Sequence, residues 1–123
     1  MRYSKIREVR SPNRGTSNSA GIPSGIKVDI PNGTMLQVCN KSGIASKKGL
    51  LVGACIVDSD YQGEMHLNLW NVSNKAVTLA SGTKLVQMIL VPILLPELEE
   101  VLEGDLFVGE TERGTGGFGS TGV

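Results

Sequence analysis

The residues best suited to chemistry stand near the end of the chain, in a segment with very little side-chain bulk. Five glycines occur among the ten residues from Arg113 to Gly122. Residues without side chains let backbone N–H groups wrap around phosphate oxygens, and Ser120 and Thr121 add hydroxyl donors. Arg113 adds a planar guanidinium that fits a phosphate, and Phe118 adds a ring that can stack on a planar ligand. The alternative is a disordered, linker-like terminus with one incidental phenylalanine.

A carboxylate that could serve as a general base directly follows an apolar dipeptide. The dipeptide is Ile56-Val57, which we expect to end a buried strand, and Asp58 follows it. Partial desolvation at this position would favour the protonated form of the carboxylate and suit it to act as a base. Tyr61, three residues later, could offer the face of its ring beside the carboxylate. A calcium loop is excluded, because its twelfth position is Leu69 where a glutamate is needed. The alternative is a polar hairpin turn that carries two acids, Asp58 and Asp60.

A third candidate is a short polar triplet after another apolar run. Lys41, Ser42 and Gly43 supply a cation, a hydroxyl and an unobstructed backbone N–H, which are the parts needed to hold a phosphate. Such triplets are also common in turns. His66, the only histidine, alternates with apolar residues and is expected to be a half-exposed strand side chain. One histidine and two distant cysteines do not support a zinc site.

Composition and charge narrow the class of protein. The chain has 123 residues, with 12 basic and 12 acidic side chains, which favours one domain and argues against coating nucleic acid or an anionic membrane. Cys39 and Cys55 lie in apolar stretches and are expected to be small buried side chains in a reducing compartment. The first residues carry charge without an apolar stretch, so we expect no secretory signal. These features predict a soluble intracellular protein, cytoplasmic or in the nucleus or a virus-infected host cell.

Period-two alternation of apolar residues predicts strands in the middle of the chain. Ile26, Val28 and Ile30 alternate with polar residues, an Asn-Gly turn follows at 32–33, and an extended run covers 35–39. A turn of this type between two extended runs predicts a β-hairpin.

Two further strands and one ambiguous segment follow. Residues 65–69 alternate strictly between apolar and polar side chains, which predicts a strand. The apolar run 85–93 also predicts a strand, and Pro92 within it implies an edge strand or an irregular exit. Residues 96–102 fit one turn of helix or a strand equally well.

The elements and composition together predict an all-β protein, a compact β-barrel or sandwich. Gly accounts for 16 residues and aromatic side chains for only 4%, so the core must be aliphatic. Residues 1–22 are polar, and we expect a solvated arm or an edge strand there. The chain is divided into one β domain over 1–112, which includes this polar segment, and a mobile glycine-rich arm over 113–123.

Taken in order, four segments resemble motifs of the trimeric deoxyuridine triphosphatase (dUTPase) family, and the resemblance extends from about Ile26 to Val123. The segments are NKSGIA (Asn40–Ala45), GACIVDSDYQGE (Gly53–Glu64), GTKLVQMIL (Gly82–Leu90) and RGTGGFGSTG (Arg113–Gly122). The second and fourth of these are highly specific.

The resemblance implies a jelly-roll-like homotrimer that hydrolyses dUTP to dUMP and pyrophosphate with Mg²⁺, in sites shared between subunits. It implies that Asp58 activates water for in-line attack on the α-phosphorus, and that Tyr61 packs on the deoxyribose and leaves no room for a 2′-hydroxyl. The other implied substrate-binding residues are Ala54, Cys55 and His66 around uracil, Lys41, Ser42, Gly43 and Gln87 along the phosphates, and Arg113, Phe118, Gly119, Ser120 and Thr121 as the closing clamp. Such chemistry needs positioning and charge neutralisation above all.

The sequence departs from the family pattern at three positions. Lys41 stands where the family has arginine, which keeps the charge but loses the bidentate fork. Cys55 stands where glycine is usual. Pro23 occupies the place of the aspartate that anchors Mg²⁺ through water, so no metal ligand is assigned. The family also has further strands after its first motif, whereas here Ile22 runs directly into Pro23, Ser24 and Gly25.

Two alternative functions remain at this level. The short connection after Ile22 motivates a catalytically impaired, dUTPase-like protein that binds a nucleotide or a protein partner. The related dCTP deaminase branch is the other alternative, and the glycine-rich tail with Phe118 argues against it.

Overall fold

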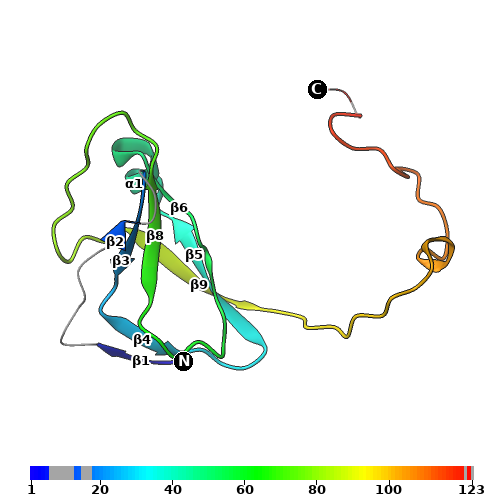
Figure 1. Ribbon diagram of the computed structural model, residues 1–123, viewed down its shortest axis with the longest axis horizontal. Helices are drawn as coiled ribbons and strands as arrows, with labels where there is room; N and C mark the ends of the chain where they lie inside the picture. The colour runs from blue at the N-terminus through cyan, green and yellow to red at the C-terminus, as the bar shows by residue number, and fades with distance from the viewer. Residues whose placement is uncertain (6–12, 15–17, 121, 123) are drawn as a thin grey trace.

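The chain folds into a β-rich body followed by a long extended arm (Figure 1). The computed structural model describes residues 1–5, 13–14, 18–120 and 122. In chain order the elements are β1 (Arg2–Lys5), β2 (Asn13–Arg14), β3 (Ser19–Pro23), β4 (Ile26–Asp29), β5 (Thr34–Asn40), α1 (Ser42–Lys48), β6 (Leu50–Val52), β7 (Ile56–Val57), β8 (His66–Asn71), β9 (Val86–Pro92) and the 3₁₀ turn η1 (Glu103–Asp105).

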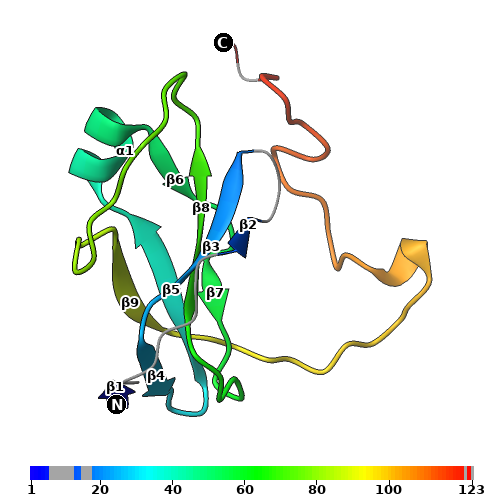
Figure 2. The ribbon, with the colours of Figure 1, turned by 60° about the vertical axis from the view of Figure 1, so that its left-hand side comes forward.

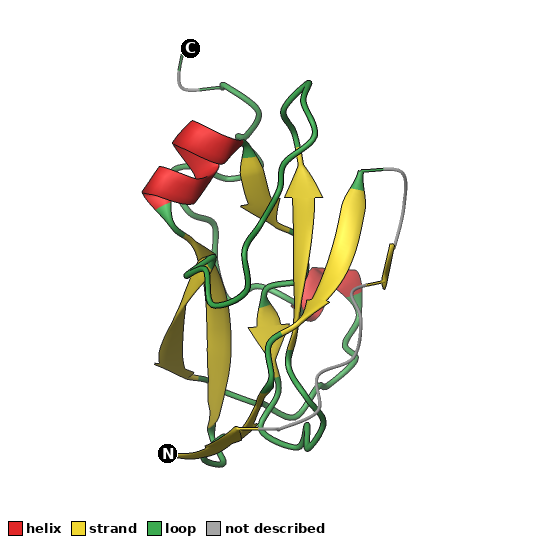
Figure 3. Ribbon diagram, turned by 90° about the vertical axis from the view of Figure 1, so that its left-hand side faces the viewer, coloured by secondary structure: helices red, strands yellow, loops and turns green. Residues whose placement is uncertain are grey.

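The described strands form three open sheets rather than one closed barrel. The largest has the strand order β2–β3–β8–β6, the second β7–β5–β9, and β1 pairs with β4 alone. Every strand pair is antiparallel. The predicted all-β class is confirmed, as a sandwich-like arrangement in which α1 lies at the end of the body opposite β1 (Figures 1 and 3).

The alternating segment at 65–69 forms the strand that the sequence predicts. Met65 and Leu69 are each only 4% exposed, while His66 between them is exposed. Alternation buries one face of β8 in the sandwich and leaves the other available. His66 is therefore a strand residue, more exposed than the half-exposed side chain expected.

The N-terminal segment contributes more to the body than the sequence predicts. β3 is an interior strand, because it pairs with β2 on one side and with β8 on the other, and Ser19 and Pro23 are buried at its two ends. The interpretation of 1–22 as a solvated arm or edge strand is thus wrong for 19–22. Residues 6–12 and 15–17 of this segment lie outside the described residues.

The Asn-Gly turn forms, but the predicted hairpin around it is wrong. The Thr34 N–H donates to the Pro31 carbonyl at 3.2 Å, and Gly33 has a φ of 77°, a conformation that favours glycine. The strands on either side nevertheless belong to different sheets, since β4 pairs with β1 whereas β5 pairs with β7 and β9. The turn acts as a corner between sheets.

Helix α1 follows β5 directly and was not predicted. Its seven residues are followed by the capping residue Gly49, which adopts the left-handed conformation with a φ of 63°. The Gly49 N–H donates to the Ala45 carbonyl at 3.1 Å. A Cβ at Gly49 would lie 2.8 Å from Ser73 Cβ. Glycine is therefore needed here both for the helix end and for the close approach of the next loop.

The core consists of two small clusters. Ile30, Leu36 and Met65 form one, and Leu50, Leu69 and Leu85 form the other. The prediction that both cysteines are buried is only partly correct, because Cys39 is half-buried whereas Cys55 is exposed. Cys55 directly precedes β7, a two-residue strand at the edge of the β7–β5–β9 sheet.

Strand β9 ends the folded body, as the proline within it suggests. It is an edge strand of the β7–β5–β9 sheet and contains Pro92, so the edge prediction is confirmed. Residues 96–102 are neither helix nor strand, and the chain runs away from the body beyond β9 (Figures 1 and 2). Leu94 and Leu98 on this arm are 93% and 97% exposed. No helix in the described ranges has the length and apolarity to cross a membrane.

Candidate active site

The chain between β6 and β8 carries most of the predicted site, and β8 holds its first part in place. The Gly53 N–H donates to the Asn68 carbonyl at 2.8 Å, and the Ala54 N–H donates to Asn68 Oδ1 at 3.0 Å. A Cβ at Gly53 would collide with Asn68 Oδ1 and would lie 2.5 Å from Trp70 Nε1. Only glycine permits this approach, so the exposed face of β8 fixes the path of the backbone that leads into β7.

Cys55 joins the same backbone to the second sheet. Its carbonyl accepts the Val38 N–H of β5 at 2.7 Å, just before the β5–β7 pairing. Gly53, Ala54 and Cys55 thus form a bridge that is hydrogen-bonded to β8 on one side and to β5 on the other. A segment held in this way presents its remaining polar groups in a fixed direction.

Asp58 directly follows β7 and is exposed. Its carbonyl accepts the Tyr61 N–H at 3.2 Å, which closes a turn. The Tyr61 hydroxyl then donates to the Glu64 carbonyl at 2.7 Å, so the 44% exposed ring is held at its far end as well. The loop therefore places an accessible carboxylate and the face of a fixed aromatic ring three residues apart.

The His66 ring meets the same carbonyl as Tyr61. His66 Nδ1 lies 2.9 Å from the Glu64 oxygen, and because a carbonyl can only accept, Nδ1 carries the hydrogen. In the neutral imidazole this leaves Nε2 as a hydrogen-bond acceptor. The 53–66 segment therefore links Asp58, Tyr61 and His66 through the Asp58 turn and the Glu64 carbonyl, and it begins at Ala54 and Cys55, which β8 and β5 hold in place.

A second group of predicted residues lies at the start of α1. Lys41 is half-buried and extended immediately before the helix, whereas Ser42 and Gly43 are exposed in its first turn. A Cβ at Gly43 would meet no atom within 4 Å, so the space above this backbone is open. Gln87 of β9 pairs with Cys39 of β5, two residues before Lys41. This pairing brings the exposed side chain of Gln87 to the end of the sheet from which α1 starts.

These two groups are connected through Asn40. Its side-chain Oδ1 accepts the Val52 N–H at 2.8 Å, which ties the end of β5 to the end of β6. The residue after Val52 is Gly53, where the bridge to β7 begins. The start of α1 and the Asp58 loop are therefore parts of one hydrogen-bonded framework.

The glycine-rich tail is folded into tight turns. The Gly116 N–H donates to the Arg113 carbonyl at 3.0 Å, the Arg113 Nε–H donates back to the Gly116 carbonyl at 2.7 Å, and the Ser120 N–H donates to the Gly117 carbonyl at 3.1 Å. These hydrogen bonds are all local, between residues of the tail itself.

Phe118 stands out within these turns. It is the one non-glycine described residue with a positive φ, 53°, and its side chain is fully exposed, while Gly119 beside it has a φ of 86°. The tail lies away from the body (Figure 1), so one chain does not bring Arg113, Phe118, Gly119 and Ser120 to Asp58. Thr121 lies outside the described residues.

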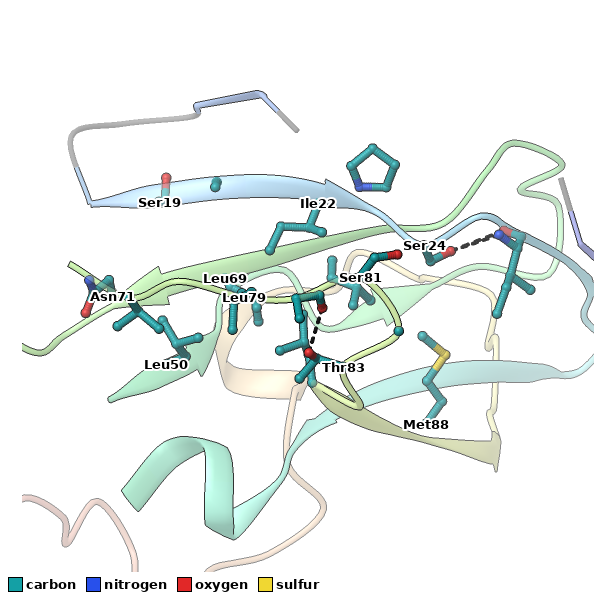
Figure 4. A pocket seen from close by; sticks show the side chains of 18 of the residues that line it. Ser19, Ile22, Ser24, Leu50, Leu69, Asn71, Leu79, Ser81, Thr83 and Met88 are labelled. Carbon is teal, nitrogen blue, oxygen red and sulfur yellow. Dashed lines mark hydrogen bonds between the residues drawn. The ribbon is translucent and has the colours of Figure 1, made fainter. Parts of the chain in front are cut away.

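Two cavities occur in different parts of the body. A cavity of about 860 Å³ is lined mainly by apolar residues, including Ile22, Leu69 and Leu79, and lies between β3, β8 and the 77–85 loop (Figure 4). Its described lining contains none of the predicted site residues. A cavity of about 350 Å³ lies beside Tyr61.

A complete metal centre is not formed by the described residues of this single chain. Within the described ranges, no three His, Cys, Asp or Glu side chains are grouped closely enough to hold a metal ion. Pro23, at the position where the sequence resemblance leads us to look for a metal-anchoring acid, is buried and paired with His66. The described residues therefore do not fit a magnesium site made by this chain alone.

Two residues whose side chains hydrogen-bond backbone N–H groups in or beside the candidate site, Asn68 and Glu64, were not singled out from the sequence. The alternation in β8 does place Asn68 on the same face as His66, which is the signal that could have identified it. Glu64 is part of the recognised GACIVDSDYQGE segment, but its partner Gly25 is 39 residues away. Spacing within a motif carries no information about such a contact.

One protein family matches this chain along nearly its whole length. The family model described as dUTPase matches residues 15–122. A deoxyuridine 5'-triphosphate nucleotidohydrolase from Yarrowia lipolytica is 38% identical, with 94% of this chain and 83% of the relative covered. The enzyme of the same name from Paramecium bursaria Chlorella virus 1 is 33% identical, with 96% and 94% covered. That from Oryza sativa subsp. japonica is 40% identical, with 98% and 66% covered.

Solved structures share the fold. A variant of the Staphylococcus bacteriophage 80alpha dUTPase with dUpNHpp superimposes with a TM-score of 0.74 at 23% identity, covering 99% of this chain and 98% of the other. A dUTPase variant from phage phi11 of S. aureus, described for its structural Mg(II) ion, gives a TM-score of 0.65 at 24% identity, covering 83% and 96%. The likeness at this identity concerns the jelly-roll-like fold.

Proposed function

The chain belongs to the dUTPase family, and on that premise we propose that it hydrolyses dUTP to dUMP and pyrophosphate. The observation that carries the proposal is the Asp58 loop, where an exposed carboxylate and a hydroxyl-anchored tyrosine ring are held three residues apart. The relatives from Yarrowia lipolytica and the Chlorella virus, which align with this chain over most of the length of both proteins, are named for this activity.

Asp58 is the general base in this proposal. A water molecule beside its carboxylate attacks the α-phosphorus, and the proton of the water passes to Asp58. The bond from the α-phosphorus to the bridging oxygen breaks, and pyrophosphate leaves with the electron pair of that bond. Positioning of the triphosphate in line with the water supplies much of the rate enhancement.

The remaining residues bind and orient the nucleotide. The backbone of Ala54 and Cys55, together with His66, surrounds the uracil edge, and the Tyr61 ring packs on the deoxyribose. Lys41 and Gln87 stand beside the phosphate chain. The Ser42 hydroxyl and the unobstructed Gly43 N–H donate hydrogen bonds to its oxygens. The closing clamp is supplied by the tail, with Arg113 and the hydroxyl and N–H groups at Gly119, Ser120 and Thr121 on the γ-phosphate, and Phe118 over the base.

The tail of one subunit serves the site of another in a homotrimer. This part of the proposal is supported by the arm beyond β9, which runs away from the body that carries Asp58 (Figure 1). Its apolar side chains are exposed in a single chain, and covering a leucine side chain stabilises an assembly by about 2 kcal/mol. The division into a β domain over 1–112 and an arm over 113–123 is kept as a prediction.

Mg²⁺ accompanies the nucleotide in this proposal. The described residues offer no protein-only metal site, and magnesium sites of this type rely largely on substrate phosphates. We therefore expect EDTA to abolish pyrophosphate release and added Mg²⁺ to restore it, whereas calorimetric titration of Mg²⁺ into nucleotide-free protein gives no binding heat. Tight Mg²⁺ binding to the free protein would contradict this expectation.

The deciding experiment is pyrophosphate release from dUTP with Mg²⁺, with dCTP, dTTP and UTP as controls. We expect release from dUTP alone. In Asp58→Asn, kcat should fall by about 10² to 10⁴ because the amide cannot accept the proton. The melting temperature should not change, since Asp58 is exposed. Binding of dUTP without release, or full turnover by Asp58→Asn, would overturn the proposed reaction or the assigned role, respectively.

A further inference from the structure

Glu64 stands where three parts of the molecule meet. Its carboxylate Oε1 accepts the Gly25 N–H at 2.8 Å, in a partly buried hydrogen bond. Its carbonyl oxygen accepts the Tyr61 hydroxyl at 2.7 Å and lies 2.9 Å from His66 Nδ1. A single residue therefore connects the turn between β3 and β4 to the aromatic ring of the Asp58 loop and to the first residue of β8.

The β3–β4 turn is itself firmly attached to this region. The Ser24 N–H donates to the Met65 carbonyl at 3.0 Å, and the Met65 N–H donates to the Ile26 carbonyl at 3.0 Å. Gly25 between them has a φ of 72°, which favours glycine. The Gly25–Glu64 bond is thus the third of three hydrogen bonds between the turn and residues 64–65, and the only one of these three that uses a side chain.

The position of the Tyr61 ring depends on the backbone at 63–64. A Cβ at Gly63 would lie 2.5 Å from the Tyr61 hydroxyl oxygen and 2.6 Å from Cζ. The phenol is therefore in direct contact with Gly63 on one side, and is hydrogen-bonded to the Glu64 carbonyl at its end. If the backbone at Glu64 shifts, the ring loses both its support and its hydrogen-bond partner.

We propose that Glu64 is a positioning residue that fixes the Tyr61 ring, and through it selects deoxyribose over ribose, by tying the Asp58 loop to the β3–β4 turn. This inference rests on the proposed function, in which Tyr61 packs on the sugar. Glu64 does not touch the reacting atoms. It acts through Tyr61, because its carboxylate holds the backbone whose carbonyl holds the ring.

The first test compares the use of dUTP and UTP by Glu64→Ala, Glu64→Gln and the matched loop control Asp60→Asn. In Glu64→Ala we expect the ratio of kcat/KM for dUTP to that for UTP to fall about 10- to 100-fold, since a displacement of about 1 Å has effects of this size. Glu64→Gln keeps an acceptor oxygen for Gly25 and should stay within about threefold of wild type. Asp60→Asn should leave the ratio unchanged. An unchanged ratio in Glu64→Ala would overturn the proposal.

A second measurement does not depend on turnover. Amide hydrogen exchange followed by NMR should show the Gly25 N–H protected in wild type and in Glu64→Gln, but exchanging at least about tenfold faster in Glu64→Ala. The Tyr61 ring resonances should shift only in Glu64→Ala. Unaltered exchange and ring resonances would overturn the positioning role. If wild type fails to hydrolyse dUTP while these spectra behave as expected, the proposed function fails and the link from Glu64 to Tyr61 stands.

Discussion

A substitution at Gly43 is expected to affect stability and substrate binding in opposite directions. Its position in α1 is open, since a Cβ would meet no atom within 4 Å. Replacing glycine by alanine in a helix stabilises it by up to about 1 kcal/mol. A methyl group would nevertheless obstruct a phosphate that approaches the backbone N–H. In Gly43→Ala we therefore expect an equal or higher melting temperature together with a KM for dUTP that rises about tenfold or more.

The control for this prediction is Gly104→Ala in η1, where a Cβ also meets no atom within 4 Å. This variant should leave both the melting temperature and KM close to wild type. If Gly43→Ala binds dUTP as well as Gly104→Ala does, then Gly43 does not hold the phosphates.

Individual site residues were predictable to the extent that they lie close together in sequence. Asp58 and Tyr61 are three residues apart, and the structure holds them in one turn. Glu64 and Asn68 position the site through partners 39 and 14 residues away, Gly25 and Ala54. Such contacts depend on which strands become neighbours. The alternation in β8 indicates only the face on which Asn68 lies, and nothing in the sequence pairs Glu64 with Gly25.

At the scale of elements, α1 makes an opposite prediction for its last position. Gly49 has a φ of 63°, and a Cβ there would lie 2.8 Å from Ser73 Cβ. The left-handed conformation costs a residue with a side chain about 1 kcal/mol or more, and the contact with Ser73 adds to this. Thermal unfolding should show that Gly49→Ala lowers the melting temperature by several degrees. An unchanged melting temperature would mean that the helix end can rearrange without cost.

Elements could be predicted where one face alone is buried. The alternation at 65–69 identifies β8, because Met65 and Leu69 point into the core while His66 does not. The hairpin prediction at 26–39 is wrong for a physical reason. An Asn-Gly turn fixes the local direction of the chain, but the partners of β4 and β5 are decided by the packing of whole sheets. Helix α1 was missed because a seven-residue helix is too short for a helical period to be visible.

At the scale of the whole molecule, the exposed arm predicts association. Leu94, Leu98 and Val108 are almost completely exposed in a single chain, which is uncommon for side chains of this kind along one segment. Together with the homotrimer proposed above, this exposure leads us to expect a trimer for wild type in sedimentation equilibrium. Replacing Leu94, Leu95 and Leu98 together by serine should weaken the assembly and lower dUTP turnover in parallel. A wild-type monomer with full activity would exclude sites shared between subunits.

The origin of the tail in each site can be decided by mixing two inactive proteins. One carries Asp58→Asn with an intact tail, and the other keeps Asp58 but ends after Glu112. Each protein alone should be inactive, since one lacks the base and the other lacks the tail. Both should remain folded, because Asp58 is exposed and the tail lies away from the body (Figure 1). In trimers reassembled from an equal mixture, about one quarter of the sites combine an intact Asp58 with an intact tail from a neighbouring subunit, and pyrophosphate release should recover to about that fraction. If tail and base instead come from one chain, no mixture can recover activity, because neither protein carries both.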